Sequence, residues 1–394
     1  MRIALIGPFG LQPKMTMARR ALPLAAGLVG RGHAATIVVP PWDCPEQSGL
    51  RGQVDGVSVI NIRLPARLPI VGHLLLTARL LRAALASDPE IIHCFKPKAY
   101  SGLVAVLVRV LQVLHLWQGR LIVDADDWEG KGGWNEEAGY SWPYRCFFSW
   151  QEQWGLRHCE AVTAASRWLC RRVGEMRADR RSVWYVPNGA AQGESDFGQP
   201  SEGDSPSVLL YTRFVEHSPA DVCEVWRVVH EAMPSARLVV VGQGIRGEEQ
   251  VLARMLAQHG LDSTTKMVHW VPMDQLKWYF HAADVAMMPV NDTILARAKS
   301  PARLLDLMAA GVPIACHAVG EYKELLHEGP SGLLVPPGDH RALGLAVVRL
   351  LSDEALRRRI GQAAKQRVES AFSWRELSGV VEQVYMNLGP RSGQ

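Results

Sequence analysis

Three carboxylates follow one short apolar run and are the densest candidate for chemistry in this sequence. Asp124, Asp126 and Asp127 come directly after residues 121–123. Carboxylates this close repel one another unless they are paired, solvated or bound to a metal ion. The pattern fits a D-x-D metal site on a diphosphate, a sugar-binding loop with its aromatic neighbours, or a structural acidic turn. We expect Asp126 and Asp127 to bind a sugar or acceptor without a metal ion.

Arg213 is a second candidate, because it ends another apolar run, 208–211. A guanidinium there suits a diphosphate, since it can donate to two oxygens at once. A solvated loop arginine is the structural alternative. Weaker candidates, which by position alone we expect to be solvated or in surface turns, are Lys14, Lys96, Lys98, His33 and His217.

Residues 298–313 predict a helix that begins beside a ligand. Ser300 is a capping residue type, and Pro301 is the residue preferred at the first helical position. A helix N-terminus carries free N–H groups and a partial positive charge, so it can hold a phosphate. Asp306 lies on the flank of the apolar stripe, where it could accept a sugar hydroxyl or remain solvated.

The glycines at positions 242, 244 and 247 match G-x-G-x-x-G after an apolar run. A dinucleotide site also needs an acid at the end of the next strand, to bind the ribose. That strand is expected to end near Val271 without an acid. We therefore expect Gly242 to start a tight turn or a loop beside another ligand.

The composition describes an ordinary globular protein of two domains. A chain of 394 residues exceeds one ordinary core, and a net charge of +4 does not indicate nucleic-acid binding. The seven cysteines are dispersed without C-x-x-C pairs, which argues against a disulfide framework and a zinc site. The N-terminus runs straight into an apolar strand, so we expect a cytoplasmic protein.

Two apolar stretches, 68–86 and 102–117, are interrupted by arginine and histidine. Neither is long and apolar enough to span a bilayer. We expect amphipathic helices that cover a sheet. The alternative is a basic surface in peripheral contact with the inner face of a membrane.

Strand and helix patterns alternate through both halves, which predicts parallel sheets covered on both faces. We expect two Rossmann-like α/β domains with the ligand in a cleft at the carboxyl ends of their strands. Residues 190–206, rich in Gly, Ser, Asp, Glu and Pro, indicate a linker. The predicted parts are 1–189, 190–206, 207–372 and a final helix and tail, 373–394. The expected strands are 3–6, 35–39, 57–63, 91–94, 121–124, 161–164, 182–186, 207–211, 236–241, 266–271, 284–289, 313–316 and 332–335.

Several segments, taken in order and spacing, resemble the family-four glycosyltransferases over most of the chain. They are Arg31–His33, Val186–Gly189, Tyr211–Phe214, Val239–Gly244, Lys299–Pro313, Gly332–Asp339 and Phe372–Trp374. The resemblance implies the two-domain GT-B fold, with a last helix that crosses back to the first domain. It also implies sugar transfer with retention of configuration, usually without a metal ion or other cofactor.

The resemblance assigns roles to individual residues. Arg213 matches the arginine on the donor diphosphate, and Asp306 matches the acid that binds the nucleotide ribose. Asp126 and Asp127 lie where the family has a polar residue near the sugar and acceptor. The donor-binding set that it implies here is Gly7, Gly10, Lys14, Gly242, Val271, Lys299, Ser300, Arg303 and Asp306.

Two family residues are replaced. Ser218 stands where the family has a diphosphate lysine, and Ala298 stands where it has the first acid of its E-x7-E motif. Losing a cation weakens charge stabilisation unless another cation substitutes, for which Lys14, Lys299 and Arg303 are candidates.

The resulting prediction is a glycosyltransferase that uses a nucleotide-diphosphate sugar. Its acceptor would be a glycan, a lipid-linked molecule or a small molecule. The first alternative is a non-catalytic protein that binds a nucleotide sugar or partners a transferase. The others are a nucleotide-sugar epimerase and a metal-dependent transferase that uses Asp124 and Asp126.

Overall fold

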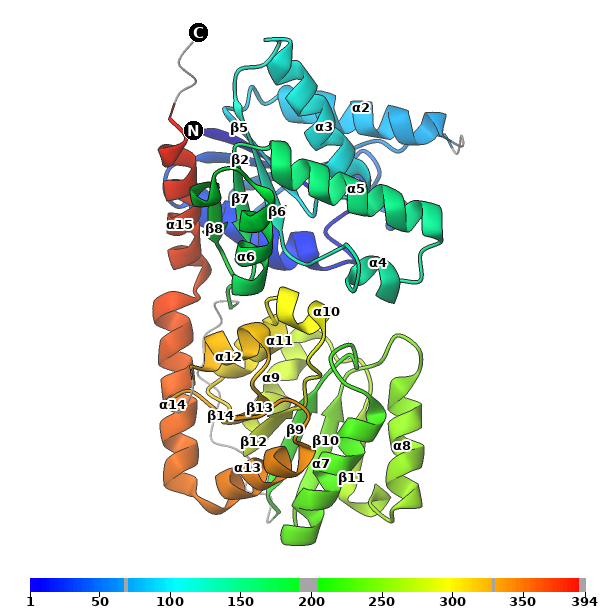
Figure 1. The fold of residues 1–394 in the computed structure, drawn as a ribbon, viewed down its shortest axis with the longest axis vertical. Coiled ribbons are helices and arrows are strands. Elements are labelled where there is room, and N and C mark those ends of the chain that lie inside the picture. Colours follow the sequence, from blue (N-terminus) through cyan, green and yellow to red (C-terminus); the bar gives the residue numbers. More distant parts are fainter. Residues whose placement is uncertain (67–69, 191–204, 328–329, 390–394) are drawn as a thin grey trace. The chain divides into compact units, whose positions relative to one another are not determined.

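The chain forms two α/β units, each built around its own sheet (Figure 1). The computed structural model describes residues 1–66, 70–190, 205–327 and 330–389. The first unit comprises Met1–Gly189, Ala298–Ser300 and the segment from Trp374 onward. The second comprises Ala190–Arg297 and Pro301–Ser373. The predicted linker lies largely outside the described residues.

The first unit contains an eight-stranded sheet in the order β3-β4-β2-β1-β5-β6-β7-β8. All neighbouring strands are parallel except β3 and β4, which form an antiparallel edge. The central strands are buried along nearly their whole length, as expected where helices cover both faces. The strands are β1 (Arg2–Ile6), β2 (Ala34–Val39), β3 (Arg51–Val54), β4 (Val57–Asn61), β5 (Ile91–Phe95), β6 (Arg120–Ala125), β7 (Ala161–Ala164) and β8 (Val183–Tyr185).

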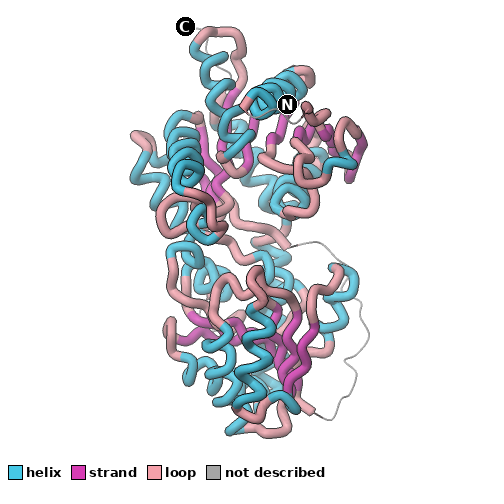
Figure 2. The backbone as a smooth tube through the Cα atoms, turned by 90° about the vertical axis from the view of Figure 1, so that its right-hand side faces the viewer, coloured by secondary structure: helices cyan, strands magenta, loops and turns pink. Residues whose placement is uncertain are grey.

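Helices flank this sheet, and Figure 2 shows strands lying between helices in each unit. The helix from the C-terminal segment, α15, packs against α1 and contributes to the apolar core below β1 and β2. The helical elements are η1 (Met17–Ala21, a π-helix), α1 (Leu22–Val29), η2 (Pro45–Gln47), α2 (Val71–Leu85), α3 (Ala99–Val113), α4 (Trp134–Glu137), α5 (Trp142–His158), α6 (Arg167–Met176), η3 (Arg180–Ser182) and α15 (Trp374–Asn387).

The second unit contains six parallel strands in the order β11-β10-β9-β12-β13-β14. Numbered along the unit, this is the order 3-2-1-4-5-6 of a doubly wound sheet. The strands are β9 (Ser207–Tyr211), β10 (Arg237–Val241), β11 (Thr265–Val268), β12 (Val285–Met288), β13 (Ile314–His317) and β14 (Leu333–Val335). The helical elements are α7 (Pro219–Ala232), α8 (Glu248–Gln258), η4 (Asp262–Thr264), α9 (Met273–His281), α10 (Ile294–Ala298), α11 (Ala302–Ala309), α12 (Gly320–Leu326), α13 (His340–Ser352) and α14 (Glu354–Ala371).

The predicted fold class is confirmed, including the final helix that returns to the first unit. The differences are local. Strand β3 was not predicted, because its four residues are all exposed and give no apolar pattern. The strand expected to end at Val271 ends at Val268. The strand expected over 57–63 ends at Asn61.

Candidate active site

The carboxyl edge of the first unit's sheet gathers three loops that carry several of the predicted residues. After β1 the chain continues to β2 on one side of the sheet, and after β5 it continues to β6 on the other side. The neighbouring strands β1 and β5 therefore mark the topological switch point of the sheet. The loop 7–14 follows β1, the loop 96–98 follows β5, and the loop 126–129 follows β6. Parallel strands place their carboxyl ends at one edge, so these three loops share it.

Lys96 is the centre of this edge. Its ammonium lies 3.0 Å from Asp127, 3.5 Å from Asp126 and 3.1 Å from Glu129. Burial opposes the charge, but the three carboxylates outweigh it and raise the pKa of Lys96 well above its ordinary value. Its backbone lies in the left-handed region, at φ 49°, a costly conformation for a residue other than glycine. The expectation that Lys96 is solvated is therefore wrong.

Lys98 and two buried glutamates extend the cluster inward. The Lys98 ammonium donates to Glu129 at 2.7 Å and lies over the rings of Tyr140 and Phe148. Glu152, from α5, accepts the backbone N–H of Glu129 at 2.9 Å. Burial, and then the nearby charge of Glu129, raise the pKa of Glu152 well above its ordinary value. Lys98 is thus also buried and paired, not solvated as expected.

The two predicted carboxylates differ in their affinity for a proton. Burial, with Asp127 and Asp124 nearby, raises the pKa of Asp126 to about 6 against the opposing charge of Lys96. Burial also acts on Asp127, but Lys96 and Lys299 outweigh it and lower the pKa of Asp127. One oxygen of Asp126 is buried with no hydrogen-bond partner among the described residues. The edge therefore presents a carboxyl of raised proton affinity beside one of lowered proton affinity.

Asp124, the first acid of the run, has a structural role. Both of its oxygens accept hydrogen bonds from Arg20 at 2.7 Å, and Thr163 donates to it at 2.5 Å. Arg20 and Asp124 are both almost completely buried. These donors occupy three of its roughly four lone-pair sites, and the buried Arg20 already balances its charge, so Asp124 does not suit the metal-dependent alternative.

Asn188 joins this network to the segment 298–300. Its side-chain oxygen accepts from Arg20 at 3.1 Å, while its backbone N–H donates to the Ser300 hydroxyl at 2.9 Å. The Ser300 hydroxyl therefore does not cap the following helix. Pro301 occupies the N-cap position of α11, without a side-chain capping bond. The predicted Ser300 cap is wrong, because a residue distant in sequence takes its hydroxyl.

Aromatic residues around this edge are engaged in the fold. Trp128, which by sequence suited stacking on a sugar, is buried and packs edge-on against Trp168. The Lys14 ammonium lies 4.1 Å from the Trp42 ring centroid and 5.3 Å from that of Phe9. Removal from water by these neighbours, with further contributions from Lys98 and Lys96, lowers the pKa of Lys14 against the pull of Asp43.

Gly7 and Gly10 behave differently within the β1 loop. A Cβ on Gly7 would lie 2.4 Å from the sulfur of Met17, so this position requires the absence of a side chain. Gly10 has no such close contact, its nearest neighbour being the Gln12 carbonyl at 3.3 Å. The sequence Lys14 to Thr16 then leads into the π-helix η1 that carries Arg20.

The carboxyl edge of the second unit contains Arg213. It follows β9 and is exposed, and the next residue, Phe214, is buried with φ 56°. Gly242 follows β10 with φ 126°, and a Cβ there would lie 1.9 Å from the Thr212 carbonyl. Gly242 is therefore required for the close approach of two backbone segments at this edge. Val271 lies beyond β11, in the loop before α9.

Arg303, a predicted spare cation, is neutralised within the second unit. Its guanidinium donates to both oxygens of Glu216 at 2.8 Å. Burial opposes its charge, but Glu216 outweighs this and raises the pKa of Arg303. His217, expected in a surface turn, is buried against Thr212 and Phe214, and burial lowers its pKa to about 4.

The two replaced family positions have clear structural roles. Ser218 is the N-cap of α7 and forms a capping box with Asp221. Ala298 is fully buried in the core of the first unit. The neighbouring Lys299 lies over the ring of Trp134, at 5.5 Å. Asp306 lies within α11 and is half-buried.

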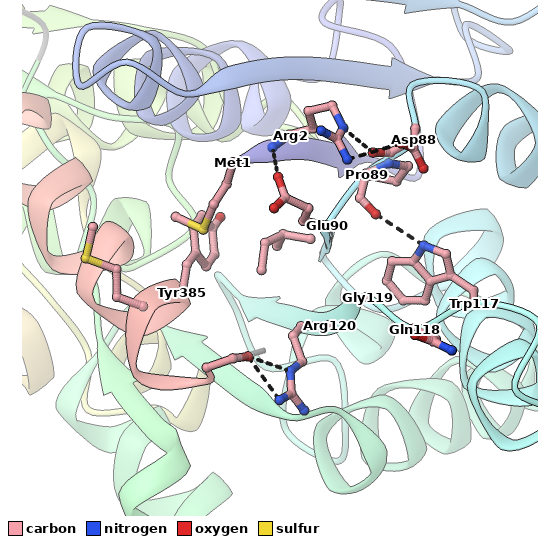
Figure 3. A pocket seen from close by; sticks show the side chains of 13 residues that line it. Met1, Arg2, Asp88, Pro89, Glu90, Trp117, Gln118, Gly119, Arg120 and Tyr385 are labelled. Atoms are coloured by element: carbon pink, nitrogen blue, oxygen red, sulfur yellow. Dashed lines mark hydrogen bonds and ion pairs between the residues drawn. The ribbon is translucent and has the colours of Figure 1, made fainter. Parts of the chain in front are cut away.

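A pocket of about 580 Å³ lies at the opposite, amino edge of the first sheet (Figure 3). Its lining includes the first residues of β1 and β5. The polar groups there bond to one another: Arg2 to Asp88, and the Trp117 indole to the Pro89 carbonyl. The pocket is thus separate from the predicted residues.

Several residues of the cluster escaped sequence analysis. The sequence alone did not indicate a role for Glu129, Glu152 or Arg20, because their roles depend on partners that are distant in sequence. Glu152 shares the buried side of α5 with Gln151, Gly155 and Leu156, so the helix pattern alone did not mark it. Within the described residues, no group of three metal-ligand side chains is placed to hold an ion. In the same residues, no helix combines the length and apolar character needed to cross a membrane.

Two family models match the chain and cover nearly all of it between them. The "Glycosyl transferase 4-like domain" matches residues 16–189, and "Glycosyl transferases group 1" matches residues 192–367. The chain belongs to this glycosyltransferase family. The two matches meet at 189–192, beside the boundary between the units.

A curated relative agrees with this assignment, and solved structures share the fold. The glycogen synthase of Mycobacterium tuberculosis is 24% identical over 238 residues, 60% of this chain and 56% of the relative. The chain therefore spans about half the length of this curated relative. Sucrose-phosphate synthase from Thermosynechococcus elongatus has a TM-score of 0.72 at 19% identity, covering 98% of each chain. Anabaena HepE in complex with UDP has a TM-score of 0.69 at 15% identity, covering 98% of this chain and all of that one. These structures share the GT-B fold.

Proposed function

We propose that this protein transfers a sugar from a nucleotide-diphosphate donor to an acceptor, with retention of configuration. The observation that carries the proposal is Arg213, an exposed guanidinium at the carboxyl end of β9 beside a strained backbone. Leaving-group departure places negative charge on the diphosphate, which a preorganised cation stabilises. Anabaena HepE, a relative in fold, is described in complex with UDP, which supports a nucleotide ligand.

Donor binding is proposed for the second unit. Arg213 would meet the diphosphate, and Asp306 would accept the ribose hydroxyls. Gly242 and Val271 would line the nucleotide with their backbones. The start of α11, after Ser300, would add the partial positive charge of a helix N-terminus even though Ser300 does not cap it. Arg303 would contribute by holding Glu216 in place, because Glu216 already balances its charge.

Sugar and acceptor contacts are proposed for the first unit. One buried oxygen of Asp126 has no hydrogen-bond partner in the part of the chain that the structure describes, and it would accept a hydroxyl hydrogen of the sugar or acceptor. Asp127 would be held in place by Lys96. Gly7, Gly10 and Lys14 would line the donor from the β1 loop, with Lys299 as a further cation. Neither a cofactor nor a metal ion is needed for these roles.

A panel of UDP-, GDP- and ADP-sugars tests the proposal. We expect release of one nucleoside diphosphate to rise when an acceptor is supplied, and the sugar to appear on the product with its configuration retained. Titration calorimetry on the same panel separates binding from turnover. Binding of a donor with no release, even with cell extracts as acceptor source, would instead establish the non-catalytic alternative.

That alternative is favoured by one observation, the loss of two family residues at Ser218 and Ala298. An epimerase is the further alternative, and sugar analysis of the recovered donor would reveal it. The reaction site is proposed to be cytoplasmic, because all seven cysteines are free. The identity of the donor base and sugar is what the panel decides.

A further inference from the structure

Three neighbouring helices of the first unit present apolar and aromatic side chains to solvent. Helix α3 packs against both α2 and α5, and the three lie side by side in Figure 1. Each buries one side, as predicted for helices that cover a sheet. The α2–α3–α5 face is defined here by the exposed residues Leu74, Leu75, Val110, Val113, Trp142, Tyr144, Phe147 and Trp150.

The aromatic side chains of this face are unusually exposed to solvent. Trp142 is 70% exposed and Tyr144 59%, although both are large side chains that proteins normally bury. They lie on the first turn of α5, and Phe147 and Trp150 continue along the same helix with stacked rings. Tryptophan and tyrosine combine an apolar ring with a polar group, which suits the boundary between lipid and water.

The charges on the three helices are almost all of one sign. Their sequences contain five arginines, at 79, 82, 109, 145 and 157, and one acid, Glu152. Glu152 is buried in the interior cluster and does not reach the surface. Helix α14 differs, since it carries arginines and lysine together with Glu354 and Glu369. Arg109 is paired with Glu160 at 3.6 Å. The basic charge that the three helices present outward therefore comes chiefly from the exposed Arg79, Arg82 and Arg157.

We propose that the α2–α3–α5 face docks on the surface of an anionic lipid bilayer. Arginines attract anionic headgroups, each contributing about 1 kcal/mol near the surface. The aromatic and aliphatic side chains then enter the interfacial layer, where their burial adds to the binding free energy.

Cosedimentation of the full chain with lipid vesicles tests this inference without any activity assay. Vesicles of phosphatidylcholine alone are compared with vesicles that also contain phosphatidylglycerol, at low and high salt. We expect binding only to the anionic vesicles, and weaker binding at high salt because ions screen the arginines. Absence of binding to anionic vesicles at low salt overturns the proposal.

Matched variants locate the contact. Trp142→Ala should weaken binding about fivefold, whereas Trp278→Ala, at a site 75% exposed in the second unit, should not. The pair Arg79→Glu and Arg82→Glu should weaken it more than tenfold, whereas Arg359→Glu on α14 should leave it unchanged. Circular dichroism checks that each variant is folded.

Two results would contradict the proposed occupant. Equal vesicle binding by the wild type and the Trp142 and Arg79/Arg82 variants would place the lipid contact elsewhere. Concentration-dependent dimers in sedimentation velocity that Trp142→Ala abolishes would show that this face binds a second copy of the chain. Neither result bears on sugar transfer, so the two proposals fail separately.

Discussion

Arg20 holds both carboxylate oxygens of Asp124 at 2.7 Å in the interior of the first unit, 104 residues away in sequence. The same guanidinium reaches Asn188 and the Val186 carbonyl. Arg20 thus fixes the end of β6 just before Asp126 and Asp127. A buried charge pair of this kind is costly to break, because removing one partner leaves the other unpaired.

Arg20→Ala should therefore lower the free energy of unfolding by about 3–5 kcal/mol. Arg2→Ala is the control, because the Arg2–Asp88 pair is exposed and should contribute no more than about 1 kcal/mol. Urea denaturation of both variants gives the comparison. Similar losses in the two would show that the Arg20–Asp124 pair has no special role.

Asp126 and Asp127 should affect the pH dependence of stability in opposite directions. The pKa of Asp126 is raised to about 6. Its contribution to the free energy of unfolding is therefore fully present below pH about 4 and is lost as the pH rises through 6. The pKa of Asp127 is lowered, so its contribution is present above pH about 4 and is lost as the pH falls.

Unfolding measured from pH 3 to pH 8 on Asp126→Asn and Asp127→Asn should resolve this. Relative to Asp126→Asn, the free energy of unfolding of the wild type should fall by up to about 3 kcal/mol between pH 4 and 6. For Asp127 the wild type should lose stability toward acid pH. Parallel curves for the two variants would mean that the proton resides elsewhere in the cluster.

Arg213→Ala should reduce kcat/KM for the preferred donor about a hundredfold or more, because it removes a transition-state contact to the diphosphate. Arg359→Ala, an exposed arginine on α14, is the control and should retain wild-type kinetics. Unfolding should be unchanged in both. Normal kinetics in the Arg213 variant would remove the proposed phosphate contact.

Ser218→Ala should lower the free energy of unfolding by about 1 kcal/mol, because the α7 capping box is lost. Ser218→Asp preserves an acceptor at the N-cap and should retain most of the stability. Ser218→Lys restores the family residue but should lose the cap as well. A lysine variant as stable as the wild type would show that the cap contributes nothing.

Ala298→Glu should be strongly destabilising, by about 3 kcal/mol or more, since the position is fully buried in an apolar cluster. Ala355→Glu, at an exposed position of α14, should stay within about 0.5 kcal/mol of the wild type. Thermal and urea unfolding measure both. A well-folded Ala298 variant would mean that the missing acid could be restored without rearrangement.

The fold was largely predictable from sequence, because buried parallel strands leave continuous apolar runs such as 207–211, which matches β9 residue for residue. Strand β3 was not, since an exposed edge strand leaves no such pattern. The positions of the candidate residues at strand ends were also predictable. Arg213 and Asp126 both follow strands at a carboxyl edge.

The partners of those residues were not predictable. Lys96 and Lys98 look like solvated loop lysines until the adjacency of β5 and β6 brings Glu129 to them. Ser300 satisfies the local rule for a helix cap, yet Asn188, 112 residues earlier, takes its hydroxyl. Local patterns predict elements, whereas pairing across a sheet depends on its topology.

The first unit is assembled from three separate pieces of the chain, the last of which begins at Trp374. Helix α15 supplies Trp374, Val381 and Val384 to its core, and Tyr385 bonds to the buried His93. During synthesis the ribosome makes the whole second unit before α15 emerges. Residues 1–189 therefore keep an apolar face uncovered until the second unit has been translated and α15 follows it. The first unit to be made is the last to be finished.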